Sequence, residues 1–166
     1  YCVPKAARIA GFRDWQVRRI ATDDRRRIDP GALGHAIEMD RLKGLKPFMI
    51  IANVGTTNTG AIDEIPRLVS IGRSHAMWVH ADAAYGGFFR LASSGPGLMP
   101  EIEECDSITL DPHKGMFLPY GTGCLLVRDP QTLKRAHSMD AEYLHDVRAQ
   151  ESENFSDLSP ELSRDF

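Results

Sequence analysis

The hydrophobic pattern of the chain alternates between short apolar runs and segments in which apolar residues recur every three or four positions. Apolar runs of strand length occupy positions 48–54, 77–81, 107–110 and 123–127, and a strand-like run covers 17–22. Helical spacing is found at 4–10, from Asp29-Pro30 to about Gly44, and at 62–75. The last two segments predict helices whose inward side chains are Leu33, Ile37, Met39, Ile65, Leu68, Val69 and Ile71.

This alternation is typical of an α/β fold with a mostly parallel sheet flanked by helices. The run FMIIANV at 48–54 is almost continuously apolar, which predicts a strand covered on both faces. From about position 138 the apolar periodicity fades, and Asp, Glu and Ser accumulate. We therefore divide the chain into a folded part at 1–137 and a second part at 138–166, which we expect to be a mobile loop region.

Polar side chains follow three of the predicted strands. Asp82 comes directly after 77–81, Lys114 follows 107–110 within DPHK, and Thr57 lies in GTTNTG after 48–54. Because ligands of open α/β sheets bind beyond the carboxyl ends of the strands, these residues predict one shared site. Each also has an ordinary structural interpretation: GTTNTG as a turn, Asp82 as a helix cap and Lys114 as a surface lysine.

Composition narrows the classes of function. The 166 residues are 42% hydrophobic and 26% charged, which suits one globular core, and the net charge of −3 gives no basic field for nucleic acid or an anionic membrane. No apolar segment is long enough to span a bilayer. The cysteines are odd in number and lack metal-ligand spacing, which predicts reduced thiols in a cytoplasmic protein and no metal site: Cys2, Cys105 and Cys124.

The segments HADAAYGG and DSITLDPHKGM, in which Lys114 lies 32 residues after Asp82, resemble the group II pyridoxal-phosphate (PLP) amino-acid decarboxylases. The segments YCVPKAARIAGF, GTTNTGAID and DLSPELSRDF also match, so the resemblance covers essentially the whole chain. It implies the PLP-dependent transferase-like large domain of fold type I. The chain starts with Tyr1, and parts of the family pattern would precede and follow it, so we expect an incomplete, central fragment.

The resemblance also implies roles for individual residues. Lys114 would form the Schiff base with PLP, which requires a neutral amine, and Asp82 would pair with the pyridine nitrogen. Ala84 would lie against one face of the ring. Further cofactor contacts would come from His113 and Ser107 near the phosphate and from Thr57 near cofactor and substrate.

Tyr143, in MDAEYLHD, resembles the family's catalytic loop tyrosine, which would return a proton to Cα after CO₂ leaves. In the family this loop reaches the partner subunit's site, so the resemblance implies a homodimer. The expected activity is decarboxylation of an L-amino acid to its amine. Gly115 follows the lysine where aromatic-substrate members tend to carry tryptophan, so an aromatic substrate is not implied. We interpret His80 as structural.

Two alternatives remain. One is another fold-type-I PLP activity, such as an aminotransferase, a lyase or a decarboxylating aldehyde synthase. The other is an inactive truncated product that does not hold PLP, and the fragment on its own is expected to be inactive.

Overall fold

The computed structural model describes residues 2–138. Six α-helices are found in this part of the chain: α1 (Cys2–Ile9), α2 (Pro30–Leu42), α3 (Ile65–His75), α4 (Gly95–Leu98), α5 (Pro112–Gly115) and α6 (Pro130–His137). Four strands form one sheet: β1 (Met49–Asn53), β2 (Trp78–Asp82), β3 (Ser107–Leu110) and β4 (Cys124–Val127). Short 3-10 helices are η1 (Asp14–Gln16), η2 (Gly87–Leu91) and η3 (Ile102–Glu104).

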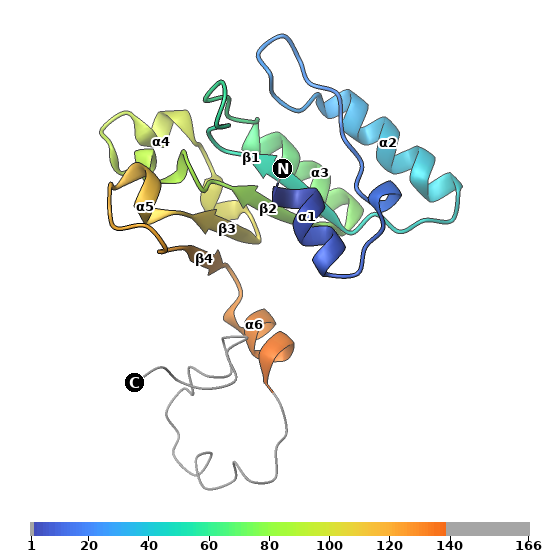
Figure 1. Cartoon of the computed structure of the whole chain (residues 1–166). Helices are drawn as coiled ribbons and strands as arrows, with labels where there is room; N and C mark the ends of the chain where they lie inside the picture. The colour runs from blue at the N-terminus through green and yellow to red at the C-terminus, as the bar shows by residue number, and fades with distance from the viewer. Residues whose placement is uncertain (1, 139–166) are drawn as a thin grey trace, which may run out of the picture.

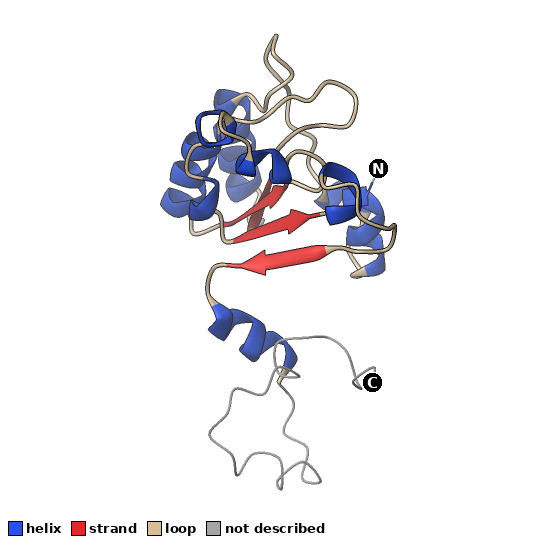
Figure 2. Cartoon of the chain, turned by 90° about the vertical axis from the view of Figure 1, so that its left-hand side faces the viewer, coloured by secondary structure: helices blue, strands red, loops and turns tan. Residues whose placement is uncertain are grey.

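The sheet has the order β1-β2-β3-β4, and its first three strands are parallel. β4 pairs with β3 in the antiparallel sense, so the sheet is mixed but mostly parallel (Figure 2). The predicted α/β class with a mostly parallel sheet is therefore confirmed. In Figure 1, α2 and α6 lie at opposite ends of the molecule, and α6 points away from the sheet.

The core lies between α3 and one face of the sheet. Leu68 and Val69 of α3 are buried, as are Ile50 of β1 and Val79 of β2. Gly72 allows the close approach of helix and sheet, because a Cβ at this position would lie 2.3 Å from Cγ2 of Val79. The 3.6-residue spacing of α3 thus places its apolar stripe on the sheet, as predicted.

Helix α2 begins at the predicted position because Asp29 caps its N-terminus and Pro30 fits its first turn. The Asp29 side chain accepts hydrogen bonds from the N–H groups of Gly31 and Ala32, and Pro30 takes the first helical position. Leu33 and Ile37 are buried, which confirms two of the predicted inward positions.

Three expectations about burial and element bounds were wrong. Met39 is 38% exposed, because it lies off the stripe that Leu33 and Ile37 turn inward. Residues 17–22 form no strand; only Thr22 makes an isolated bridge, with Ile28. The helix predicted from position 62 begins at Ile65, since Ile62 is engaged in a bridge with Val54.

The prediction that 48–54 is covered on both faces holds for one face and only in part for the other. Burial alternates along β1, with Ile50 and Ala52 buried and Met49 exposed. The second face carries the partly buried polar side chains of β2, including His80 and Asp82. α1 lies over this face in Figure 1. An apolar run in one strand did not reveal that the same face of its neighbour is polar.

Candidate active site

The parallel strands bring three predicted site residues to one edge of the sheet. Asp82 is the last residue of β2, and its register partners are Asn53 on β1 and Thr109 on β3. Lys114 lies in α5, which begins two residues after β3 ends. Thr57 lies in the loop that follows β1, and it is exposed. The topology places the three residues at the same edge, and their common function as a binding site stays a prediction.

Backbone hydrogen bonds join the three loops of this edge. The Gly86 N–H donates to the Val54 carbonyl over 3.1 Å, which ties the loop after β2 to the end of β1. The Asp111 N–H donates to the Ala84 carbonyl over 3.3 Å, which ties the start of α5 to the same loop. The loop after β2 is thus the central piece that positions the other two.

The loop after β2 lies unusually close to the end of β1 at Gly86. An added Cβ on Gly86 would lie 2.3 Å from the Val54 oxygen and 2.9 Å from Cα of Gly55. Gly55 itself has φ +83°, a conformation that L side chains rarely adopt. The two glycines allow the backbone of the threonine loop to lie against the AAYGG segment.

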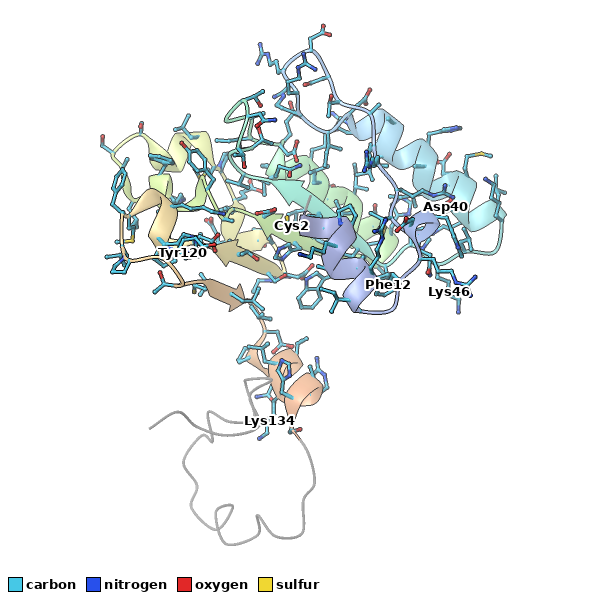
Figure 3. The ribbon with its side chains drawn as sticks, viewed as in Figure 1. Cys2, Phe12, Asp40, Lys46, Tyr120 and Lys134 are labelled. Carbon is cyan, nitrogen blue, oxygen red and sulfur yellow. The ribbon has the colours of Figure 1, made fainter. Side chains whose placement is uncertain are left out.

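The carboxylate of Asp82 is oriented by two donors. Its Oδ1 accepts the Ala84 N–H over 3.3 Å, and its Oδ2 accepts from Sγ of Cys2 over 3.7 Å. Cys2 begins α1 and lies over the sheet in Figure 3. The sequence motifs did not indicate the contact with Cys2, because it joins residues 80 positions apart.

Lys114 is paired with a residue that the sequence reasoning missed. Its Nζ lies 2.6 Å from Oδ2 of Asp111, three positions earlier. His113 lies beside the same carboxylate, with Nε2 at 3.9 Å from Oδ2, and its Nδ1 is 2.5 Å from the Thr122 carbonyl. A carbonyl only accepts, so His113 carries a proton on Nδ1. An acidic residue three positions before the lysine was the signal for this pair.

Ser107 is not brought to the carboxyl edge. It begins β3, and its Oγ accepts from Trp78 Nε1 over 2.8 Å and shares a hydrogen bond with His80 Nδ1 over 2.7 Å. The other nitrogen of His80 shares a hydrogen bond with Thr109 Oγ1 over 3.1 Å. Burial lowers the pKa of His80, partly opposed by the Asp82 carboxylate. Burial therefore favours the neutral form of His80, and both of its ring nitrogens are hydrogen-bonded, in line with its structural interpretation.

The last two predicted site residues are Thr57 and Tyr143. Thr57 lies in a loop whose turn is closed by its neighbours, since Thr56 Oγ1 bonds Thr59 Oγ1 over 2.7 Å and accepts from the Ala61 N–H over 3.1 Å. Tyr143 lies outside the described residues, as does nearly all of the segment 138–166.

Comparison with known proteins decides the family. The family model of the pyridoxal-dependent decarboxylase conserved domain matches residues 1–166. The chain belongs to the pyridoxal-dependent decarboxylase family. Membership confirms the resemblance drawn from HADAAYGG and DPHK, the fold class and the pyridoxal cofactor predicted for the family.

Individual members show how far the similarity extends. The chain is 42% identical over its whole length to an aromatic-L-amino-acid decarboxylase of Bacillus atrophaeus, and 33% identical over 87% of its length to a cysteine sulfinic acid decarboxylase of Rattus norvegicus. It covers 35% and 29% of these relatives. The chain therefore spans about a third of the length of the curated relatives it matches.

Solved structures of the family superpose closely on the chain. The crystal structure of Oryza sativa TDC with PLP and tryptamine matches with a TM-score of 0.87 and 32% identity, over 96% of this chain and 34% of that one. The apo structure of mouse CSAD matches with a TM-score of 0.86 and 31% identity, over 99% and 34%.

The donor set at the carboxyl edge fits the family's cofactor. Asp82 offers a carboxylate for a protonated ring nitrogen, and Lys114 offers an amine for an aldehyde. Ala84, whose N–H donates to Asp82 and whose carbonyl accepts from Asp111, adds a small side chain to the loop after β2. An open depression of about 340 Å³ lies elsewhere, lined by residues that include Arg27, Glu64 and Arg67, and contains none of the candidate residues. We assign the site by its chemistry and topology.

Residues 2–138 contain neither a membrane-spanning helix nor a group of metal-binding side chains. No helix in this part of the chain is long and apolar enough to cross a membrane. Within the same residues no three His, Cys, Asp or Glu side chains are grouped in a way that could hold a metal ion.

Proposed function

We propose that the full-length protein is a PLP-dependent decarboxylase that converts an L-amino acid to the corresponding amine and CO₂. The observation that carries this proposal is the placement of Asp82 and Lys114 after adjacent parallel strands, with their loops joined by the hydrogen bond between Asp111 and Ala84. Family membership supports the same activity.

Three residues of the chain would have separate roles in binding and using the cofactor. When bound, PLP supplies the electron sink that stabilises the carbanion left after loss of CO₂. Lys114 holds the cofactor through its amine nitrogen, and Asp82 keeps a proton on the pyridine nitrogen by its negative charge. Ala84 leaves room for the ring because its side chain is a single methyl group.

The remaining site residues stay predictions. His113 and Thr57 lie at the carboxyl edge, where they can contact the phosphate and the substrate. Ser107 would need a different arrangement, because its hydroxyl is engaged by Trp78 and His80. Tyr143 is proposed to deliver the proton to Cα of the product.

A homodimer in which the segment 138–166 contributes to the partner's site is part of the proposal. The loop after α5 supports it, because the side chains of Phe117 and Tyr120 are each 93% exposed. Aromatic side chains exposed to this degree on one loop suit a surface that the rest of the protein or a partner subunit covers. Tyr120 is labelled in Figure 3.

A cytoplasmic location also remains a proposal. All three cysteines are free thiols, which suits a reducing compartment. Burial, followed by the neighbouring Asp106 carboxylate, raises the pKa of Cys105 to about 11, so this thiol stays protonated and unreactive at neutral pH.

Aromatic L-amino acids are the first substrates to test, because the relative from Bacillus atrophaeus is an aromatic-L-amino-acid decarboxylase. Acidic substrates are the second class, because the chain also matches cysteine sulfinic acid decarboxylases. Gly115 does not discriminate between these two substrate classes. A Cβ at this position would lie 3.2 Å from the side-chain Cβ of Phe88, so local packing already limits which residue can follow the lysine.

The test is an amine-product screen of the full-length protein with PLP, comparing wild type, Lys114→Ala and Lys46→Ala. Lys46 is an exposed lysine outside the site and serves as the matched control. We expect amine and CO₂ from wild type and Lys46→Ala, and neither from Lys114→Ala. Borohydride reduction followed by peptide mass spectrometry should place the cofactor on Lys114; an adduct on another lysine would contradict the assignment.

A second candidate is a decarboxylating aldehyde synthase. The chain matches the crystal structure of Rhodiola rosea 4-hydroxyphenylacetaldehyde synthase with a TM-score of 0.76 and 28% identity, over 81% of its length. The same screen separates the two activities, because aldehyde and ammonia with consumption of oxygen would replace the amine. An inactive product that binds no PLP would give no signal in either assay.

A further inference from the structure

A chain of side-chain hydrogen bonds runs along the polar face of the sheet toward its carboxyl edge. The Trp78 Nε1–H, at the start of β2, donates to Ser107 Oγ over 2.8 Å. Ser107 Oγ lies 2.7 Å from His80 Nδ1, and His80 Nε2 lies 3.1 Å from Thr109 Oγ1. Ser107 is the register partner of His80, whereas Thr109 is the register partner of Asp82. The chain therefore ends in the same row of the sheet as the candidate cofactor-binding carboxylate.

The hydrogen-bonding capacity of Ser107 sets the direction of this chain. The tryptophan N–H can only donate, so it occupies one acceptor position of the serine oxygen. Ser107 is 6% exposed, and among the described residues its hydroxyl contacts only Trp78 and His80. If His80 donated from Nδ1, the serine would accept twice and its own buried proton would have no partner. Pairing of every group requires that Ser107 donates to Nδ1 and that the ring proton lies on Nε2, which donates to Thr109.

The surroundings of His80 suit a ring that carries a single proton. Burial lowers the pKa of His80, and in the described part of the chain Asp82 is the one charge that opposes this effect. The register partners of His80 on β1 and β3 carry no charge. The charged residues of α1, which lies over this face in Figure 1, are the exposed Lys5 and Arg8. The imidazole therefore acts toward Asp82 as a dipole whose direction depends on its tautomer.

We propose that Ser107 is a positioning residue that fixes His80 as its Nε2–H tautomer and thereby directs a chain of N–H and O–H dipoles toward Asp82. Each donor then points toward the carboxyl edge, and hydrogen bonds aligned in this way strengthen one another. The positive end of the chain lies in the row of Asp82, where it stabilises the negative charge that would hold the cofactor's ring nitrogen. A neutral dipole does so without competing with that nitrogen for the carboxylate. This role replaces the phosphate contact expected of Ser107, and its effect on the cofactor rests on the proposed function.

The tautomer is measured on the full-length protein without cofactor. Nitrogen NMR of protein labelled in its histidine rings distinguishes the two tautomers, and the signals of His80 are identified by their loss in His80→Gln. We expect the wild-type ring to carry its proton on Nε2. In Ser107→Ala both tautomers should be populated, because Thr109 can donate or accept, and Ser107→Thr should restore the wild-type signal. A proton on Nδ1 in wild type would overturn the proposal, and this result does not depend on the folding of a Ser107 variant.

The effect on Asp82 is measured by titrating the full-length protein with PLP and with pyridoxal, which has the same ring and aldehyde but no phosphate. If Ser107 acts through His80, Ser107→Ala should weaken the binding of both ligands by the same factor, about two- to tenfold. Ser107→Thr should bind both as wild type does. In an Asp82→Asn background Ser107→Ala should have no further effect, because the charge on which the dipoles act is gone. Ser74→Ala is the matched control, since Ser74 is an exposed serine of α3 that bonds the Ile71 carbonyl, and it should change neither affinity.

The two ligands separate this role of Ser107 from a direct contact with the phosphate. A loss of affinity confined to PLP would mean that Ser107 binds the phosphate, and it would overturn the proposal while the proposed function stands. Normal affinity of Ser107→Ala for both ligands would overturn it as well. If neither ligand binds to Lys114 in wild type, the proposed function fails together with the effect on Asp82. The tautomer of His80 in the cofactor-free protein then still decides whether the chain runs toward the carboxyl edge.

Discussion

Replacing Gly86 by alanine would separate the loops that build the candidate site. Gly86 has φ −84° and ψ −20°, a conformation that alanine adopts without strain, so the substitution tests space alone. The new Cβ would lie 2.3 Å from the Val54 oxygen, 2.9 Å from the Val54 carbonyl carbon and 2.9 Å from Cα of Gly55. All three atoms are backbone, so no side chain can rotate away.

The expected loss of stability follows from two contributions. Overfilling a packed contact costs about 1–3 kcal/mol. Moving the loops apart also breaks the bond from the Gly86 N–H to the Val54 carbonyl, 3.1 Å long, which adds about 1 kcal/mol. We therefore expect the free energy of unfolding to fall by roughly 2–4 kcal/mol. PLP should also bind more weakly, because the threonine loop would no longer lie against the loop that carries Asp82.

The assay is urea unfolding of the full-length protein, with and without PLP, for wild type, Gly86→Ala and Gly34→Ala. Gly34 lies within α2, and an added Cβ there meets no atom within 4 Å, so alanine should stabilise the helix by about 0.5–1 kcal/mol. Opposite signs for the two variants are the predicted result. A Gly86→Ala protein within about 0.5 kcal/mol of wild type and with normal PLP affinity would refute the packing argument.

Three other substitutions test separate parts of the structure. Asp63 is buried and accepts from the backbone N–H groups of Ile28 and Asn53, each over 2.7 Å, so Asp63→Ala should cost roughly 2–5 kcal/mol by leaving two donors unpaired, measured by urea unfolding. Burial lowers the pKa of His80, so below pH of about 6.5 the unfolded state takes up a proton more readily than the native state, and stability falls as the pH decreases. His80→Gln should flatten this decline in unfolding curves recorded below that pH and leave the slope above it unchanged; an identical slope in both proteins would contradict the linkage. Tyr143→Phe should reduce amine formation about 10²–10⁴-fold while PLP remains bound, as followed by product analysis and cofactor absorbance, and unchanged turnover would remove the tyrosine from the mechanism.

The sequence was sufficient for the features that depend on strand ends. Asp82 and Lys114 were placed at a shared edge because an apolar run followed by polar residues indicates where a parallel strand stops. The start of α2 could also be predicted, because Asp29 caps the helix that Pro30 begins, and both effects depend only on neighbouring residues. Such signals act over a few residues and need no knowledge of the rest of the fold.

Contacts between distant residues could not be predicted in this way. The bond from Cys2 to Asp82 joins positions 80 residues apart, and the tie from Gly86 to Val54 depends on two loops meeting in space. The role of Ser107 shows the same limit. Its place in the motif suggested the phosphate, whereas its position at the start of β3 gives its hydroxyl to Trp78 and His80.

The edge strand β4 has a consequence for handling the chain in isolation. Among the described residues β4 pairs only with β3, so the hydrogen-bonding groups along its other side have no strand partner. Leu125 and Leu126, which alternate between its two faces, are each about half exposed. An open edge with apolar residues on both faces recruits further strands. A polypeptide limited to these residues would therefore aggregate edge to edge in solution, and charged substitutions at Leu125 or Leu126 would be the natural means of keeping it soluble.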